Sequence, residues 1–254
     1  MGRPEPPTLT NLTINPGARR PAGTPRAIGA IVGAIIGAVV ILVFALRRYG
    51  VWREGDRFTL GRTRGIRAAD GLRYRVHLAH ADSDGAAETL AELNRRAITL
   101  MRHLRGKYLN GPSAGRFPAR SRATKRLLGL YNPDNLAENS PQDPRGDTSY
   151  TLDKGAILAI CLREKDPSRR GDPRAHDIHD IETLTYVTLH ELTHIAIKEH
   201  DHPPLFWRAF KFVLEEAAEA GILQAVDYGR DPVVYCGVDI DYNPAFDSSI
   251  EPLI

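Results

Sequence analysis

The stretch from His190 to His194 reads His-Glu-Leu-Thr-His and is the most informative part of this 254-residue chain. Residues i and i+4 of a helix lie one above the other on the same face, so both imidazole rings can reach a single metal ion. Glu191 lies roughly 100° further around the helix axis, where its carboxylate can accept a proton from a water molecule without binding the metal. The spacing therefore predicts a zinc-binding helix with His190 and His194 as ligands and Glu191 as the catalytic base.

A third protein ligand is expected, because a catalytic zinc ion normally has three protein ligands and one open position. His200 follows His194 by six residues, at the point where the helix is expected to end, and a chain that turns back there can present its imidazole to the same ion. We therefore expect His200 to be the third ligand. His202, eight residues after His194, is the first alternative, and an acidic residue elsewhere in the chain is the second.

Hydrophobic periodicity outlines the elements around this motif. Apolar residues at three- and four-residue spacing predict helices over 84–108, 180–198 and 205–220. Ser149 to Arg163 is typical of a strand pair whose apolar run, Ile157 to Leu162, is a candidate edge for pairing with an extended substrate. A further short strand is expected over 233–240, and a loop is expected between 108 and 149. The pattern favours an α+β fold.

The chain divides into five expected segments. Residues 1–26 contain many prolines and little apolar surface and are expected to be disordered. Residues 27–46 are predicted to be a transmembrane helix, and residues 47–76 a basic linker. The folded domain is expected over 77–245, and residues 246–254 form a tail.

The predicted span is an uncharged run of twenty residues, which at 1.5 Å per residue crosses about 30 Å of hydrocarbon. Such a span would hold the protein in membrane lipid. Gly29, Gly33 and Gly37 lie on one stripe of it and favour self-association through a close helix contact. The arginines that follow predict a single-pass membrane protein with its C-terminal domain on the cytoplasmic side, or inside the virion if the protein is viral.

The net charge of +3 conceals a basic first half and an acidic second half. Arginine clusters bind phosphate, but Arg outnumbers Lys by 28 to 6 throughout the chain, which is more typical of coding bias than of a selected surface. Nucleic acid is therefore not an expected partner. The only two cysteines, Cys161 and Cys236, form no CxxC pair, and we expect them to be buried apolar residues rather than ligands or a disulfide.

The zinc motif, His200-Asp201 and Phe206-Trp207 together resemble the HELxHxxxxxHDxxFW signature of the WLM metallopeptidases, which are related to the SprT zinc proteases. The outer motifs Asp153-Lys154-Gly155, Cys161-Leu162-Arg163 and Tyr235-Cys236-Gly237 are similar to WLM-like proteins of giant DNA viruses and protists. The resemblance implies zinc ligation by His190, His194 and His200, catalysis by Glu191, and packing of the Phe-Trp pair behind the site. Four residues separate Asp201 from Phe206 where the usual pattern has two.

These observations predict a zincin-like metallopeptidase domain, a small sheet packed on the zinc helix, preceded by a single transmembrane helix. The expected activity is zinc-dependent hydrolysis of a protein or peptide substrate, with Tyr235 or Tyr242 as possible oxyanion donors. The alternative is a catalytically silent, membrane-anchored structural or interaction protein that retains the zinc-binding fold. Four other histidines are expected to be surface residues: His77, His80, His176 and His179.

Overall fold

The computed structural model describes residues 63–78, 80–139, 148–163 and 177–254. This part of the chain contains four α-helices: α3 (Ser83–Tyr108), α4 (Pro118–Leu130), α5 (Ile181–Ala196) and α6 (Pro204–Glu219). The expectations for residues 1–26 and 27–46, and for the first part of the linker, lie outside the described residues.

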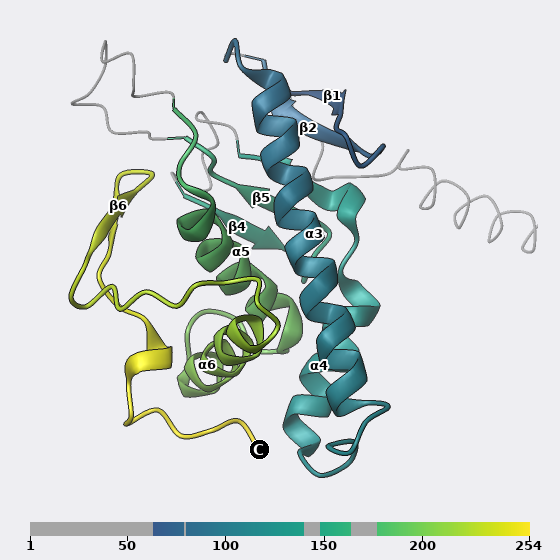
Figure 1. Ribbon diagram of the computed structural model, residues 1–254, viewed down its shortest axis with the longest axis vertical. Coiled ribbons are helices and arrows are strands. Elements are labelled where there is room, and N and C mark those ends of the chain that lie inside the picture. Colours follow the sequence, from purple (N-terminus) through teal and green to yellow (C-terminus); the bar gives the residue numbers. More distant parts are fainter. Residues whose placement is uncertain (1–62, 79, 140–147, 164–176) are drawn as a thin grey trace, which may run out of the picture. The chain divides into compact units, whose positions relative to one another are not determined.

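A mixed five-stranded sheet lies beside these helices, with the strand order β1-β2-β3-β5-β4. Strand β1 (Thr63–Arg67) pairs antiparallel with β2 (Arg73–His77), and β3 (Leu136–Glu138) lies parallel to both β2 and β5 (Ile157–Ile160). Strand β4 (Tyr150–Leu152) pairs antiparallel with β5. Figure 1 shows the long helix α3 crossing this sheet, with α5 and α6 beside it. A separate two-stranded sheet is formed by β6 (Val233–Tyr235) and β7 (Val238–Ile240).

Helix α3 forms where the apolar periodicity predicts it. The side chain of Asp82 accepts a hydrogen bond from the backbone amide of Gly85 and caps the first turn, while Arg105 and Lys107 complement the dipole in the last turn. The apolar residues of the helix pack on the sheet and on α5, and their side chains are buried: Ala86, Leu90, Leu93, Ala97, Leu100 and Leu104.

The fold class is α+β, as expected, but the more specific fold prediction is wrong. The described residues form four helices and a mixed sheet, and this arrangement does not show a zincin fold. Within the described ranges, each helix is too short or too polar to cross a lipid bilayer. The predicted zincin-like arrangement is therefore replaced by an α+β domain with a mixed sheet, while residues 27–46, where the transmembrane helix is predicted, lie outside the described residues.

Two segment boundaries differ from the expectation. Strands β1 and β2 lie inside the stretch that was expected to be linker, because alternating burial of Tyr74 and Val76 places β2 against α3. The expected C-terminal tail is also attached: Arg120 Nε donates to the Leu253 carbonyl over 2.6 Å, and the Leu253 side chain is buried. The folded domain therefore extends further in both directions.

Helix α4 lies in a segment that was expected to be a loop. Pro118 occupies the first turn, where its missing amide donor has no cost, and Ala123 and Leu127 are buried one turn apart. Few of its side chains are buried, so its apolar periodicity is weak. Prolines and glycines flank the helix on both sides, and such residues are more typical of a loop.

The two cysteines form a disulfide bond, contrary to the expectation that they are unpaired apolar residues. Cys161 follows β5 and Cys236 lies in the turn between β6 and β7, 75 residues further along the chain. Both side chains are buried, as expected, but their sulfur atoms are bonded. The bond links the small sheet to the large one.

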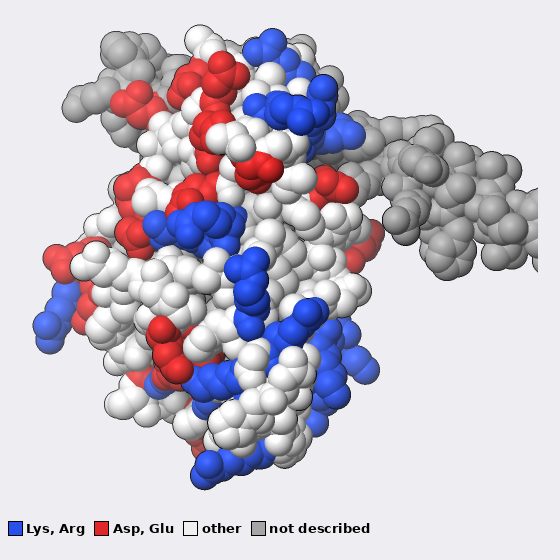
Figure 2. All heavy atoms as spheres, turned by 45° about the vertical axis from the view of Figure 1, so that its right-hand side comes forward, with Lys and Arg blue, Asp and Glu red and all other residues white. Residues whose placement is uncertain are grey.

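Positive charge dominates α3 and α4. Between Glu92 and Asp134 the sequence contains ten Lys and Arg residues and no Asp or Glu. Figure 2 shows Lys and Arg gathered on the lower part of this face of the molecule. Arg96 pairs with Glu92 on its own helix, and other ion pairs reach further helices, as in the Lys107–Glu216 pair with α6 and the Arg96–Glu182 pair with α5. These ion pairs connect the helices to one another.

Candidate metal centre

Helix α5 carries the first two histidines and the glutamate. Asp180 caps the helix by accepting hydrogen bonds from the amides of Glu182 and Thr183, as the sequence predicts. The threonine hydroxyls at 185, 188 and 193 donate to carbonyls one turn earlier, which satisfies them inside the core. Because the helix is buried on nearly every side, His190 and His194 are held on a fixed, partly exposed face.

The loop after α5 brings His202 to these two histidines. The ring centroids of His190, His194 and His202 are 5.1, 4.9 and 5.0 Å apart, and the Nε2 atoms of His202 and His190 are separated by 2.9 Å. Their ligand atoms all lie within 4.8 Å of one another. Three imidazole nitrogens in this arrangement match the donor set of a catalytic zinc site.

His200, the expected third ligand, does not belong to this group. It lies on the same loop, is exposed and lines the same cavity, but the structure places His202 beside the zinc-motif histidines instead. Asp201 has φ of 58°, a left-handed conformation, so the loop reverses direction between the two histidines. The geometry therefore groups the alternative, His202, with the two zinc-motif histidines, and the identity of the third ligand stays a prediction.

Phe206 packs behind the site, as the resemblance implied for the Phe-Trp pair, whereas Trp207 lines the cavity. The Phe206 ring is fully buried, and its centroid lies 4.8, 4.5 and 4.5 Å from those of His190, His194 and His202. The Trp207 centroid lies 5.7 Å from that of His202. These contacts fix the three rings from the α6 side.

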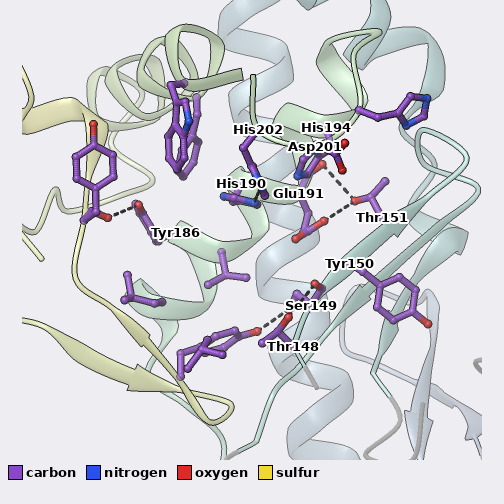
Figure 3. A pocket seen from close by; sticks show the side chains of 18 of the residues that line it. Thr148, Ser149, Tyr150, Thr151, Tyr186, His190, Glu191, His194, Asp201 and His202 are labelled. Carbon is purple, nitrogen blue, oxygen red and sulfur yellow. Dashed lines mark hydrogen bonds between the residues drawn. The ribbon is translucent and has the colours of Figure 1, made fainter. Parts of the chain in front are cut away.

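Glu191 is buried directly beside the histidines, with 5 % of its surface exposed. Thr151 Oγ1 donates a hydrogen bond to Glu191 Oε2 over 2.9 Å, and Figure 3 shows the two side chains pointing toward each other. Burial raises the pKa of Glu191 to about 7, although the Thr151 hydrogen bond acts in the opposite direction. A carboxyl with this pKa can accept and release a proton near neutral pH.

The electrostatics of the three imidazoles suit a metal site. Burial, and then the neighbouring histidines, lower the pKa of His190 to about 3. Burial, followed by His202, lowers the pKa of His194 to about 4. Burial also lowers the pKa of His202, against the opposing effect of Asp201. Neutral imidazole is the form that binds a metal ion, so the residues present fit zinc.

Thr151 reaches the site because β4 packs closely against α5. The turn between β4 and β5 contains Asp153 and Lys154 with positive φ, followed by Gly155 with φ of 108°. A β-carbon at Gly155 would lie 3.1 Å from Ile195 Cδ1 and 3.2 Å from the Leu130 carbonyl oxygen, so a glycine is needed at this contact. The strand that was expected to be the free edge, β5, is flanked by β3 and β4. In the described part of the sheet the edge strands are β1 and β4, and β4 is the one that packs beside the site.

The histidines and Glu191 lie in an open cavity of about 760 Å³. Figure 3 shows them between β4 on one side and the hairpin formed by β6 and β7 on the other. Residues Thr148 to Thr151 line the first wall, and the second wall contains Trp207, Tyr235 and the segment 238–242. A groove bounded by a sheet edge can accept an extended chain by strand pairing.

The two possible oxyanion donors already have other hydrogen-bond partners. Tyr235 donates to the Cys161 carbonyl over 2.7 Å and lies 2.6 Å from Ser149 Oγ. The Tyr242 hydroxyl donates to Asp247 Oδ2 over 2.7 Å. Both residues line the cavity, but their hydroxyl groups are held by the protein.

A second group of potential ligands, His103, Glu216 and Glu219, is an ion-pair centre. Lys107 Nζ lies 2.9 Å from Glu216 Oε2 and 2.5 Å from Glu219 Oε2, so an ammonium group already supplies the positive charge. Tyr108 donates to Glu216 Oε1 over 2.6 Å. This group connects α3 to α6 and has no need of a metal.

Comparisons with known proteins place the chain beside viral sequences. Over 106 residues, 42% of the chain, it is 42% identical to an uncharacterized protein of Acanthamoeba polyphaga mimivirus and covers 49% of that protein. Over 110 residues it is 31% identical to an uncharacterized protein of Invertebrate iridescent virus 6 and covers 57% of it. The chain spans about half the length of the curated relatives it matches. No family model matches the chain, and no solved structure matches it.

The sequence reasoning missed two site residues. Thr151 lies forty residues before Glu191 on a different element, and no local pattern marks it. The spacing predicts His202 only as the alternative to His200. The loop before Phe206-Trp207 is two residues longer than in the family signature, which indicates that it follows a different path. His179 was expected on the surface, but its ring packs on Tyr235 with centroids 5.1 Å apart.

Proposed function

We propose that this protein is a zinc-dependent peptide hydrolase in which His190, His194 and His202 hold the metal ion and Glu191 is the general base. The observation that carries the proposal is the convergence of three imidazole nitrogens within 4.8 Å beside a buried carboxylate, in a cavity bounded by the edge strand β4. A purely structural zinc site needs the ligands but has no use for Glu191. The resemblance to the WLM metallopeptidases supports the same activity.

Each residue has a defined task in this reaction. Zinc, when bound, lowers the pKa of a water molecule and polarises the scissile carbonyl. Glu191 accepts a proton from the attacking water and passes it to the leaving amine, and Thr151 keeps its carboxylate oriented for both transfers. Strand β4 holds the substrate backbone in an extended conformation across the site.

The substrate class follows from the open groove. A cavity lined on one side by a strand edge and on the other by aromatic and aliphatic side chains suits an unfolded segment of protein. A folded protein would have to expose such a segment before it could be cleaved. We therefore assign unfolded or flexible polypeptide as the substrate.

The test compares the zinc-loaded full chain with its Glu191→Gln variant on an unfolded, fluorescently labelled casein. Glutamine preserves the shape of the side chain but cannot act as a base, so zinc content is expected to stay the same while cleavage falls by at least a hundredfold. A chelator is expected to abolish wild-type cleavage and added zinc to restore it. Equal cleavage by the two proteins would refute the proposal, and a wild type without cleavage would favour a silent zinc-binding protein.

A further inference from the structure

The β6–β7 hairpin forms one wall of the cavity but belongs to neither the large sheet nor a helix. Its two strands pair through Val233–Ile240 and Tyr235–Val238, with Cys236 and Gly237 at positive φ in a two-residue turn. Val234 and Val238 remain 56 % and 44 % exposed. A hairpin with three-residue strands is not stable alone, so its position depends on how it is attached.

One end of the hairpin is fastened at a single place, next to the disulfide bond. The bond joins Cys236 in the turn to Cys161 after β5. Beside it, Ser149 Oγ accepts a hydrogen bond from the Cys161 amide over 2.9 Å and is 2.6 Å from the Tyr235 hydroxyl. The Tyr235 hydroxyl donates to the Cys161 carbonyl over 2.7 Å. The disulfide bond and this hydrogen-bonded cluster thus attach the turn end of the hairpin to Ser149, which precedes β4, and to Cys161, which follows β5.

The other end of the hairpin has only noncovalent attachments. The Tyr186 hydroxyl donates to the Tyr242 carbonyl over 2.7 Å. The rings of Trp207 and Tyr242 meet edge to face at 5.5 Å. Both contacts are at the cavity, so movement of the hairpin would change the groove directly.

We infer that the Cys161–Cys236 disulfide is a redox-dependent fastening that controls substrate binding in the cavity. When the bond is formed, the hairpin is held as the wall opposite β4. When the bond is reduced, the hairpin is held only by noncovalent contacts, namely hydrogen bonds, ring contacts and the apolar packing of Val233, Tyr235 and Ile240, and the wall opens. This inference rests on the proposed function for its effect on catalysis, but the movement of the hairpin does not depend on it.

The metal site is expected to survive reduction. His190 and His194 lie on α5, and Phe206 on α6 packs against all three histidine rings. These contacts come from helices that pack on each other, and neither cysteine belongs to them. Reduction should therefore affect the groove and leave the ligands in place.

The redox step is a thiol–disulfide exchange with a dithiol reductant. A thiolate of the reductant attacks one sulfur, the Cys161–Cys236 bond breaks, and the second thiol of the reductant displaces the mixed disulfide. Two electrons and two protons pass to the cysteines, and the reductant becomes a disulfide.

Both cysteines are 1 % exposed, so the exchange requires local opening at the exposed turn around Gly237. His179 Nε2 lies 3.7 Å from Cys236 Sγ, where a protonated imidazole would stabilise the released thiolate.

The first experiment is hydrogen–deuterium exchange on the zinc-loaded full chain, either oxidised or reduced with a phosphine that does not compete for zinc. The Cys161→Ala/Cys236→Ala variant is measured in parallel. The amides of 233–242 are expected to exchange at least tenfold faster in the reduced chain and in the variant, with 181–196 unchanged. Equal exchange of the hairpin in oxidised and reduced wild type would overturn the inference, as would faster exchange of both segments together. The reduced wild type decides the question if the variant does not fold.

The second experiment measures peptide cleavage under the same conditions. The KM is expected to rise at least fivefold on reduction while kcat and zinc content stay within twofold, and reoxidation is expected to restore the KM. Val234→Thr, which keeps the disulfide and changes an exposed hairpin side chain outside the cavity lining, is the matched control and should change KM by less than twofold in the oxidised state. An unchanged KM on reduction would contradict the control of substrate binding. Absence of cleavage in both states would refute the proposed function, and the exchange result would still decide whether the bond fastens the hairpin.

Discussion

Glu191 is positioned by a single threonine on the neighbouring sheet. Its carboxylate is buried, and the hydroxyl of Thr151 holds one oxygen at 2.9 Å while the helix holds the backbone. A buried carboxylate with several rotamers available would reach the attacking water only part of the time. The hydrogen bond selects one of them, so in the proposed reaction Thr151 would be a positioning residue that acts through Glu191.

Thr151→Val tests this role at the residue scale. Valine has the same shape but no hydroxyl, so it cannot orient Glu191. The expected loss of about 1.5 kcal/mol of transition-state stabilisation lowers kcat about tenfold. Thr151→Ser is the matched rescue and should retain most of the wild-type kcat, because it keeps the hydrogen bond. Both variants are expected to retain zinc, which is measured by mass spectrometry of the metal. A serine variant as slow as the valine variant would show that the methyl group matters instead of the hydroxyl.

The residue identities of the helical part of the site could be predicted from sequence. His190, Glu191 and His194 are fixed relative to one another by helical geometry, so five residues of sequence determine their arrangement. Thr151 could not be predicted in this way, because its contact depends on how tightly the β4–β5 turn packs at Gly155. That packing is a long-range property of the fold.

The loop between α5 and α6 determines which histidine completes the site. The helix ends at Ala196, Ile197 is extended, and the left-handed conformation of Asp201 turns the chain so that His202 meets His190. Spacing alone does not distinguish His200 from His202, because both are within reach of the helix end. The positions of the two histidines depend on the path of the loop, including the left-handed conformation of Asp201, which a sequence does not display.

Two substitutions of Asp201 separate backbone conformation from charge. Asparagine tolerates positive φ, whereas β-branched valine is disfavoured there by about 1–2 kcal/mol. Asp201→Val is therefore expected to weaken zinc binding roughly tenfold, and Asp201→Asn to weaken it much less, although both remove the carboxylate. Competition titration with a chromogenic chelator measures the two affinities. Equal affinities would show that the loop conformation does not position His202.

At the scale of the whole molecule, Glu216 connects three helices. It lies on α6, is 3 % exposed, and accepts hydrogen bonds from Lys107 and Tyr108 of α3, while Arg120 of α4 lies 3.9 Å away. These partners belong to a stretch of sequence without carboxylates of its own. Glu216 therefore supplies buried negative charge to the basic residues at the C-terminal end of α3 and the start of α4.

Glu216→Leu is expected to lower the free energy of unfolding by about 2–3 kcal/mol, because it leaves the Tyr108 hydroxyl and the Lys107 ammonium without their buried partner. Glu219→Gln is the control: it removes the neighbouring carboxylate, which is mostly exposed, and should cost less than about 1 kcal/mol. Urea denaturation followed by circular dichroism measures both. If both variants lose a similar free energy of unfolding, the buried Glu216 contributes no more to stability than the exposed Glu219.

The fold could be predicted in part. Helices α3, α5 and α6 and the β4–β5 hairpin follow from periodicity and capping residues, and they lie close to the expected bounds. Helix α4 was missed because few of its residues are buried, and the sheet order depends on contacts between distant segments. The Cys161–Cys236 bond joins residues 75 positions apart with no spacing motif, so two cysteines alone could not reveal it.

The identity of the third ligand is tested most directly by the zinc content of the full chain after dialysis, for the wild type, His200→Ala and His202→Ala. The geometry predicts that the wild type and His200→Ala each retain about one zinc ion per chain and that His202→Ala loses it, because three imidazole ligands are needed for tight binding. Circular dichroism confirms that each variant is folded. Retention of zinc by His202→Ala together with its loss from His200→Ala would contradict the site described above.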